Sequence, residues 1–180
     1  MKIVATLIIC VFSFQNIYSQ DTIWIISDGE IGNMKIGDSI KNYNYPLINS
    51  LKYIGDGYRI YENTYQIMDS CLITVGFNYY INDTNIISYL QTSCEKCQLL
   101  NGIHPGIDIK KALASDSDLS FGVGYGPELS YYKFFKNSYL KLKIDNDTEY
   151  KYFQENNKEL QLKILQNGLI TTLELIKLNN

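Results

Sequence analysis

The chain has 180 residues, 16 of them tyrosine, and a formal net charge of −3 at pH 7. Arg59 is its single arginine and no cluster of basic residues lines up with aromatics, so the sequence lacks the positive surface that a nucleic-acid backbone requires. We therefore expect no nucleic-acid binding, and the length suits one mid-sized domain or two small ones.

The N-terminal segment has the pattern of a secretory signal peptide. A basic residue precedes an apolar run over 3–14, and a more polar stretch over 16–19 ends in a small residue. The run is shorter than the roughly 20 apolar residues that cross a bilayer. Cys10 leaves a lipid anchor open as an alternative, although Ile9 stands where a lipobox has a small side chain. The sequence thus predicts a signal peptide over 1–19 and a secreted or periplasmic mature chain without a transmembrane segment.

Strand patterns dominate the first half of the mature chain. A β-rich run covers 22–27, and Asp38-Ser39 predicts the start of a short helix that Pro46 must stop or bend. Alternating apolar residues then predict two hairpins, one of strands 58–62 and 65–68 around Asn63-Thr64, the other of strands 71–80 and 85–92 around Asn82-Asp83.

The second half follows a similar order. Asp108 predicts the cap of a short helix over 108–113, and strands over 130–136 and 139–145 are expected to turn at Asn137-Ser138. The strongest hairpin signal is Asn167-Gly168, between strands over 160–166 and 169–178. Pairing across that turn would set Leu162 opposite Leu173 and Leu160 opposite Leu175 on one face of a half-buried sheet.

Two segments of the chain resemble each other. Residues 58–65 return as residues 132–139 with three identical positions and four that keep their chemistry. Self-similarity of this kind indicates a repeated structural unit. We therefore predict an α+β fold of two tandem units, over 20–100 and 101–180, each a short helical motif followed by an antiparallel sheet of about four strands. The duplication requires the two octapeptides to occupy equivalent hairpins.

The Gly-x-x-Ile-Lys turns at Gly37 and Gly106 are similar to the glycine turn that opens the helix in two known families. The predicted tandem units resemble the secreted β-lactamase-inhibitory proteins and, more distantly, the small outer-membrane assembly lipoproteins of the BamE type. The leader, which ends in Ser19-Gln20, also resembles those of secreted proteins from Bacteroidetes-like bacteria. These resemblances imply an extracytoplasmic protein that binds other proteins; they carry over no contact residue.

Residues with catalytic or ligating chemistry are sparse. His104 is the only histidine and lies in a turn-rich connector, with neither a nucleophile nor an orienting acid marked around it. The acidic pairs 116–118 and 145–147 do not continue into a calcium loop, and the glycines over 122–126 lack the strand-then-helix context of a dinucleotide site. The sequence therefore predicts no enzyme activity, no cofactor and no metal.

The mature chain holds three cysteines that are disulfide candidates: Cys71, Cys94 and Cys97. A hairpin around Asn82-Asp83 pairs Ile73 with Thr92, Val75 with Leu90 and Gly76 with Tyr89. It places Cys71 opposite Cys94, within reach of a disulfide. A bulge would bring Cys97 to Cys71 instead, and a Cys94–Cys97 bridge is a further alternative. A zinc site of the three cysteines with His104 has a full ligand count, but an oxidising compartment disfavours it.

The aromatic residues suggest how such a protein would act. Tyrosine buries much area while keeping a polar tip, which favours it at interfaces, although it also suits half-buried sheet positions. We therefore expect a secreted or periplasmic, non-catalytic protein-binding module in the manner of an inhibitor. The alternative is an envelope scaffold or assembly protein with no soluble target. The expected binding surface comprises Tyr58, Tyr61, Tyr132 and Phe135.

Overall fold

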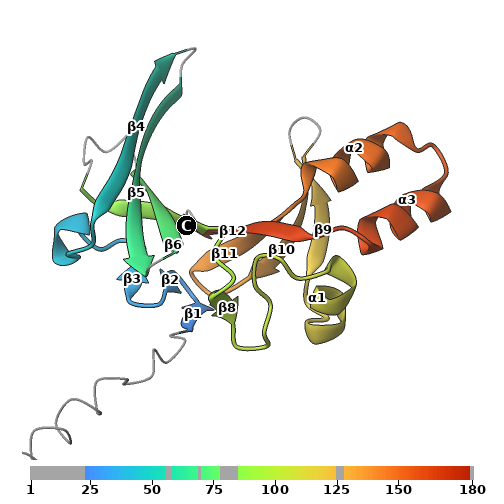
Figure 1. Ribbon diagram of the computed structural model, residues 1–180, viewed down its shortest axis with the longest axis horizontal. Helices are drawn as coiled ribbons and strands as arrows, with labels where there is room; N and C mark the ends of the chain where they lie inside the picture. The colour runs from blue at the N-terminus through green and yellow to red at the C-terminus, as the bar shows by residue number, and fades with distance from the viewer. Residues whose placement is uncertain (1–22, 56–57, 69, 78–84, 125–127, 179–180) are drawn as a thin grey trace, which may run out of the picture.

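The computed structural model describes residues 23–55, 58–68, 70–77, 85–124 and 128–178 (Figure 1). The predicted signal peptide over 1–19, Cys10 and the Asn82-Asp83 turn lie outside these residues. The described part is mostly β, with 49% of it in strands and 20% helical. Two sheets, of eight and four strands, account for the strands.

The large sheet is antiparallel throughout and has the strand order β4-β5-β6-β7-β12-β11-β10-β9. Four strands from each half of the chain form a meander, and the two meanders join where β12 pairs with β7. The β4–β5 hairpin rises away from the rest of the molecule (Figure 1). The strands are β4 (Leu47–Gly55), β5 (Tyr58–Met68), β6 (Cys71–Phe77), β7 (Ile87–Thr92), β9 (Ser120–Val123), β10 (Leu129–Phe134), β11 (Ser138–Ile144) and β12 (Ile170–Lys177).

The small sheet packs beside the large one and has the order β3-β2-β1-β8. Its turns need glycine: Gly32 has φ +62°, and a Cβ there would lie 2.2 Å from Cε3 of the Trp24 ring. β8 pairs in parallel with β1, which ties the connector after β7 back to the start of the described chain. The strands are β1 (Trp24–Ser27), β2 (Glu30–Ile31), β3 (Met34–Lys35) and β8 (Cys97–Leu99).

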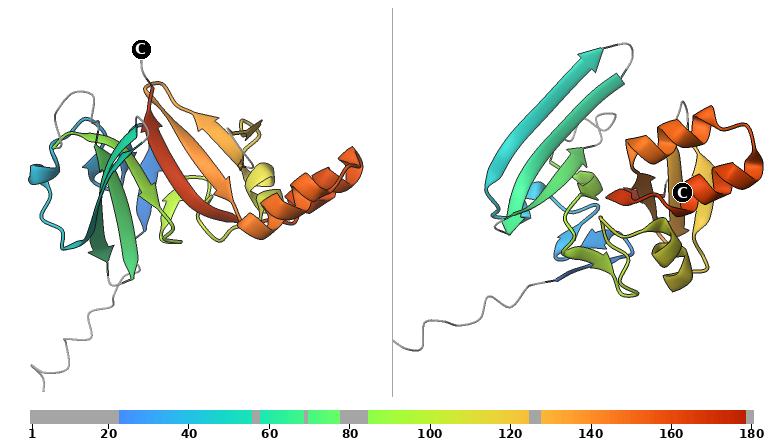
Figure 2. Two further views of the ribbon diagram at one scale, coloured as in Figure 1. Left: turned by 90° about the horizontal axis from the view of Figure 1, so that it is seen from above. Right: turned by 45° about the vertical axis from the view of Figure 1, so that its right-hand side comes forward.

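Three α-helices and one 3₁₀ turn complete the described part of the fold. They are η2 (Ile40–Asn42), α1 (Ile109–Ser115), α2 (Asn146–Gln154) and α3 (Lys158–Gln166). Asp145 caps α2 by accepting a hydrogen bond from the Thr148 N–H at 2.8 Å, and Asn157 caps α3 in the same way. α2 and α3 lie side by side at the end of the sheet away from the β4–β5 hairpin (Figure 2). No helix in the described residues is both long and apolar enough to cross a membrane.

One face of the large sheet carries the core. Strand alternation sends every second side chain to this face, and β11 shows it over its whole length, from buried Ser138 to buried Ile144. The small sheet, α1 and the end of α3 cover it, so that Ile26, Ile109 and Leu165 join one continuous cluster. Because the core lies on one side, the side chains in between point to the other face, which these elements leave open.

The prediction of two tandem helix-plus-sheet units is wrong. Residues 58–65 lie inside one uninterrupted strand, β5, whereas residues 132–139 span the end of β10, a turn and the start of β11. Asn63 pairs with Val75 and Thr64 with Thr74, so no turn forms at that site. Where a helix was expected in the first half, the structure has the 3₁₀ turn η2. The octapeptide similarity therefore reflects shared strand composition and not a shared hairpin.

The hairpin predicted around Asn167-Gly168 is also wrong, because α3 occupies residues 158–166. Asn157 at its N-cap and an exposed Glu159–Lys163 pair four residues apart favour the helix. Leu162 is 57% exposed rather than paired with Leu173, which lies between Leu142 of β11 and Thr92 of β7.

The register predicted for the β6–β7 hairpin is confirmed. Ile73 pairs with Thr92, Val75 with Leu90 and Gly76 with Tyr89. Cys71 and Cys94 form a disulfide at its open end, with their Cα atoms 5.3 Å apart. Cys97 is the free, buried cysteine of the described residues.

Candidate functional site

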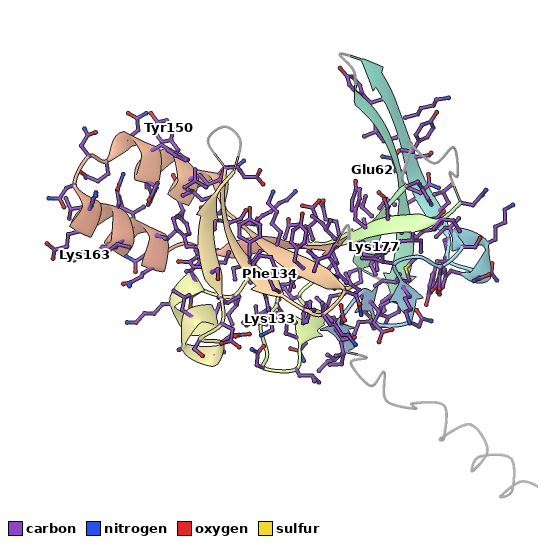
Figure 3. All side chains as sticks on the ribbon, turned by 180° about the vertical axis from the view of Figure 1, so that it is seen from behind. Glu62, Lys133, Phe134, Tyr150, Lys163 and Lys177 are labelled. Atoms are coloured by element: carbon purple, nitrogen blue, oxygen red, sulfur yellow. A yellow bond between two sulfur atoms is a disulfide. The ribbon has the colours of Figure 1, made fainter. Side chains whose placement is uncertain are left out.

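The open face of the large sheet carries a row of paired residues, three of which are aromatic. Directly paired residues on neighbouring strands share a face, so the register identifies the row strand by strand. Figure 3 labels its two ends, Glu62 on β5 and Phe134 on β10. We call it the aromatic row; from β5 to β10 it contains Glu62, Gly76, Tyr89, Ile176, Tyr139 and Phe134.

A second row on the same face lies two residues along each strand and is mostly polar. From β5 to β10 it contains Thr64, Thr74, Gln91, Glu174, Lys141 and Tyr132. Tyr132 joins it to the aromatic row, because its ring centroid lies 6.3 Å from that of Tyr139. Phe134 lies 6.0 Å from Tyr139 in turn. Tyr132, Phe134 and Tyr139 thus form one cluster, which we call the aromatic cluster.

Glycines let two of these tyrosine rings lie against the sheet. A Cβ on Gly76 would lie 1.8 Å from Cε1 of Tyr89, and one on Gly122 would lie 2.8 Å from Cε2 of Tyr132. An aromatic ring that covers a strand glycine shields the backbone there. The Tyr89 hydroxyl donates a hydrogen bond to the Glu62 carboxylate. Burial and this carboxylate both raise the pKa of Tyr89, which therefore stays protonated and able to donate.

Four charged side chains on or beside the open face form two ion pairs. Nζ of Lys141 lies 2.6 Å from a Glu128 carboxylate oxygen, and Nζ of Lys143 lies 3.1 Å from one of Glu174. Burial by itself would lower the pKa of Lys141, but the hydrogen bond to Glu128 and the nearby Glu174 outweigh it and raise that pKa. Lys141 and Glu174, each with a side chain 16% exposed, also face each other across β11 and β12. The open face therefore presents aromatic surface and hydroxyl groups within a framework of compensated charge.

The structure does not gather the four residues that the sequence suggested for binding. Tyr132 lies on the open face, but Tyr61 alternates with Glu62, packs against the core and has Nζ of Lys52 5.1 Å from its ring centroid. Phe135 also packs against the core. The side chain of Tyr58 lies outside the described residues.

Sequence reasoning missed Tyr89, Phe134, Tyr139 and Ile176. A signal for some of them was present: the predicted hairpins already paired Gly76 with Tyr89 and set Tyr132 and Phe134 on one face of their strand. The contribution of Ile176 could not be found in this way, because it depends on the pairing of β12 with β7 and β11.

A cavity of about 310 Å³ lies on the opposite, core side of β10, beside the small sheet. Its polar groups are engaged within the protein. The Asp28 carboxylate accepts hydrogen bonds from Asn137 and from the Ser138 hydroxyl, the latter at 2.7 Å, and Lys133 forms an ion pair with Asp116 at 2.5 Å. The wall that the cavity presents is therefore mainly apolar. Its lining residues are Ile26, Ser27, Asp28, Leu99, Leu100, Asn101, Lys133 and Phe135.

Asp116, Asp145 and His104 have structural partners. Asp116 accepts hydrogen bonds from Lys133 and Asn101, and although burial alone would raise its pKa, these bonds hold it below the ordinary value. Asp145 caps α2. Nδ1 of His104 lies 2.6 Å from the carbonyl oxygen of the adjacent Pro105.

The three cysteines form the other notable cluster. Within the described residues, Cys71, Cys94 and Cys97 are the group of metal-capable side chains whose ligand atoms lie close together, all within 4.8 Å of one another. His104 is not a member, so the four-ligand zinc alternative does not assemble. Two of the three sulfurs are joined in the disulfide.

No protein-family model matches the chain, and neither a curated protein nor a solved structure matches it. The candidate site is therefore defined by residues of this chain alone: the aromatic row, the polar row beside it and the paired charges between them.

Proposed function

We propose that this chain is a secreted or periplasmic, non-catalytic protein-binding module that holds a protein partner on the open face of its large sheet. The observation that carries the proposal is the aromatic cluster of Tyr132, Phe134 and Tyr139, continued by Tyr89 along the aromatic row. Phe134 is 62% exposed in this arrangement. Aromatic anchors of this kind contribute most of the binding energy in protein interfaces.

The mode of action follows from how the rings are held. Tyr89 and Tyr132 lie against glycine backbone, and Tyr89 is further fixed by its hydrogen bond to Glu62. Side chains that are ordered before binding lose little conformational entropy when a partner arrives. The two lysines of the open face, Lys141 and Lys143, are already paired with Glu128 and Glu174. We infer recognition by shape, aromatic contact and hydroxyl hydrogen bonds, in the manner of an inhibitor that covers its target.

The compartment assignment has its own support. The Cys71–Cys94 disulfide is typical of proteins that fold in oxidising surroundings, such as the periplasm or the extracellular space. On the open face the Tyr89 hydroxyl lies against the Glu62 carboxylate, but its raised pKa makes it a poor nucleophile. The proposal therefore contains no catalytic step.

The test is a binding experiment on the mature chain with surface variants. Partners are captured from periplasm or culture medium, and the main one is purified and titrated against wild type, Phe134→Ala and Tyr139→Ala. Tyr150→Ala is the matched control, because Tyr150 is 67% exposed on α2, away from the open face. We expect each open-face variant to weaken binding about tenfold or more and the control to leave it unchanged.

Two outcomes contradict the proposal. Equal affinity for wild type and both open-face variants, with unchanged melting temperatures, would place the contact elsewhere. Co-fractionation with outer-membrane complexes, without any stoichiometric soluble partner, would favour the envelope scaffold instead.

A further inference from the structure

The third cysteine lies beside the disulfide in a geometry that suits exchange. The sulfurs of Cys71, Cys94 and Cys97 are all within 4.8 Å of one another. The N–H of Cys97 donates to the carbonyl oxygen of Cys94 at 3.0 Å, which closes a tight turn. Residues at the two ends of such a turn have Cα atoms within about 7 Å, a separation close to what a disulfide spans. Cys94 can therefore form a disulfide with either Cys71 or Cys97.

We propose that these cysteines form an internal thiol–disulfide exchange centre in which Cys97 attacks Sγ of Cys94 and displaces Cys71. A new bond forms between the sulfurs of Cys97 and Cys94 as the Cys71–Cys94 bond breaks. The bonding pair leaves with Sγ of Cys71, which takes up the proton that Cys97 gives up. The count of thiols and disulfides is unchanged, so the step needs no external oxidant or reductant.

The exchange would move a covalent link from one part of the fold to another. Cys71 begins β6, so its bridge to Cys94 closes the open end of the β6–β7 hairpin. A Cys94–Cys97 bridge would instead close the turn between β7 and β8 and leave β6 without a covalent tie. The buried Thr92 hydroxyl lies between these segments, 3.0 Å from the Leu72 carbonyl oxygen and 3.7 Å from Sγ of Cys97.

The resting state is protected against this exchange. Cys97 is fully buried, and burial raises the pKa of its thiol to about 11. The attacking species is the thiolate, which is therefore scarce at neutral pH. The exchange is expected to speed up as pH rises and whenever β8 separates from its neighbours.

The main experiment locates the free thiol in the wild-type mature protein. The protein is incubated without reductant at pH 7 and pH 10, quenched with excess N-ethylmaleimide at acidic pH in denaturant, and mapped by peptide mass under non-reducing conditions. We expect the label on Cys97 at pH 7 and a growing share on Cys71 at pH 10, together with a Cys94–Cys97 peptide. Cys97→Ser is the control and should carry no label at either pH.

Two results would overturn the proposal. A label that stays on Cys97 at pH 10 shows that no exchange occurs, and a label that moves to Cys94 shows that the attack goes to the other sulfur. The Cys71→Ser variant gives an independent measurement. If it folds, it should form a Cys94–Cys97 disulfide with no free thiol when it is oxidised with glutathione disulfide, whereas two free thiols after that treatment would refute the geometry. If it does not fold, the wild-type mapping still decides.

Discussion

The ring of Tyr89 occupies the space that a side chain at position 76 would need. The two residues face each other across β6 and β7, and a Cβ on Gly76 would lie 1.8 Å from Cε1 of the ring. Gly76 thus leaves the space on the open face that the Tyr89 ring occupies. Other close contacts in the molecule can be tested in the same way, by substituting one of the two residues.

Gly76→Ala should displace the Tyr89 ring and break its hydrogen bond to Glu62. We expect a loss of about 2 kcal/mol in the free energy of unfolding, as for other overpacked sites. Urea unfolding measures it. In a Tyr89→Ala background the same substitution should cost almost nothing, because the clash is gone. An equal cost in both backgrounds would show that the ring is not the obstacle.

The Cys71–Cys94 disulfide should stabilise the fold by limiting the unfolded chain. The two cysteines are 23 residues apart in sequence. Closing a loop of this length contributes about 3 kcal/mol to the free energy of unfolding in the chain-entropy model. The double variant Cys71→Ser/Cys94→Ser should lose about this much in urea unfolding. Reductant should destabilise wild type and leave the double variant unchanged. A double variant that still responds to reductant would contradict this assignment.

Stability should fall in acid partly through Asp116. Its ion pair with Lys133 holds the folded-state pKa below the value of the unfolded chain. A lowered carboxyl pKa contributes stability above the unfolded pKa of about 4, and this contribution is lost as pH falls through the folded pKa. The melting temperature of wild type should exceed that of Asp116→Asn most clearly at pH 6–7. The gap should narrow as pH falls below about 4; a constant gap would indicate a role other than charge.

Asp145 should stabilise the start of α2 and the segment that leads into β12. Its carboxylate accepts hydrogen bonds from the N–H groups of Thr148 and Leu169, both at 2.8 Å. Asp145→Ala should lower the free energy of unfolding by about 1 kcal/mol or somewhat more, as for other lost helix caps. Asp145→Asn keeps an acceptor at the cap and should recover at least part of that loss. Thermal unfolding of the two variants distinguishes them, and equal losses would argue against capping.

Local features of this fold could be predicted from the sequence. The β6–β7 register followed from one turn and from alternation, and it correctly placed Cys71 beside Cys94. The turn between β10 and β11 was located to within a residue or so. These elements are set by short-range pairing, where turn chemistry and side-chain period agree.

Other features could not be predicted, because two sequence patterns competed or because the pairing involves segments far apart in the chain. The run over 160–166 fits both periods, and the Asn157 cap decides for a helix. Residues 58–65 and 132–139 share a composition suited to strands but not a turn. The open face itself needs β12 between β7 and β11, a pairing of remote segments that no local motif specifies.

The position of β12 has a consequence for how the chain folds. Its partner β7 precedes it by the whole of β8–β11 and α1–α3, so the centre of the large sheet closes only after all of these have been made. Until then β7 and β11 are each an unpaired edge strand with apolar side chains. Exposed edge strands of this kind promote aggregation. The Cys71–Cys94 disulfide would hold the β6–β7 hairpin together until β12 arrives as the final neighbour of β7.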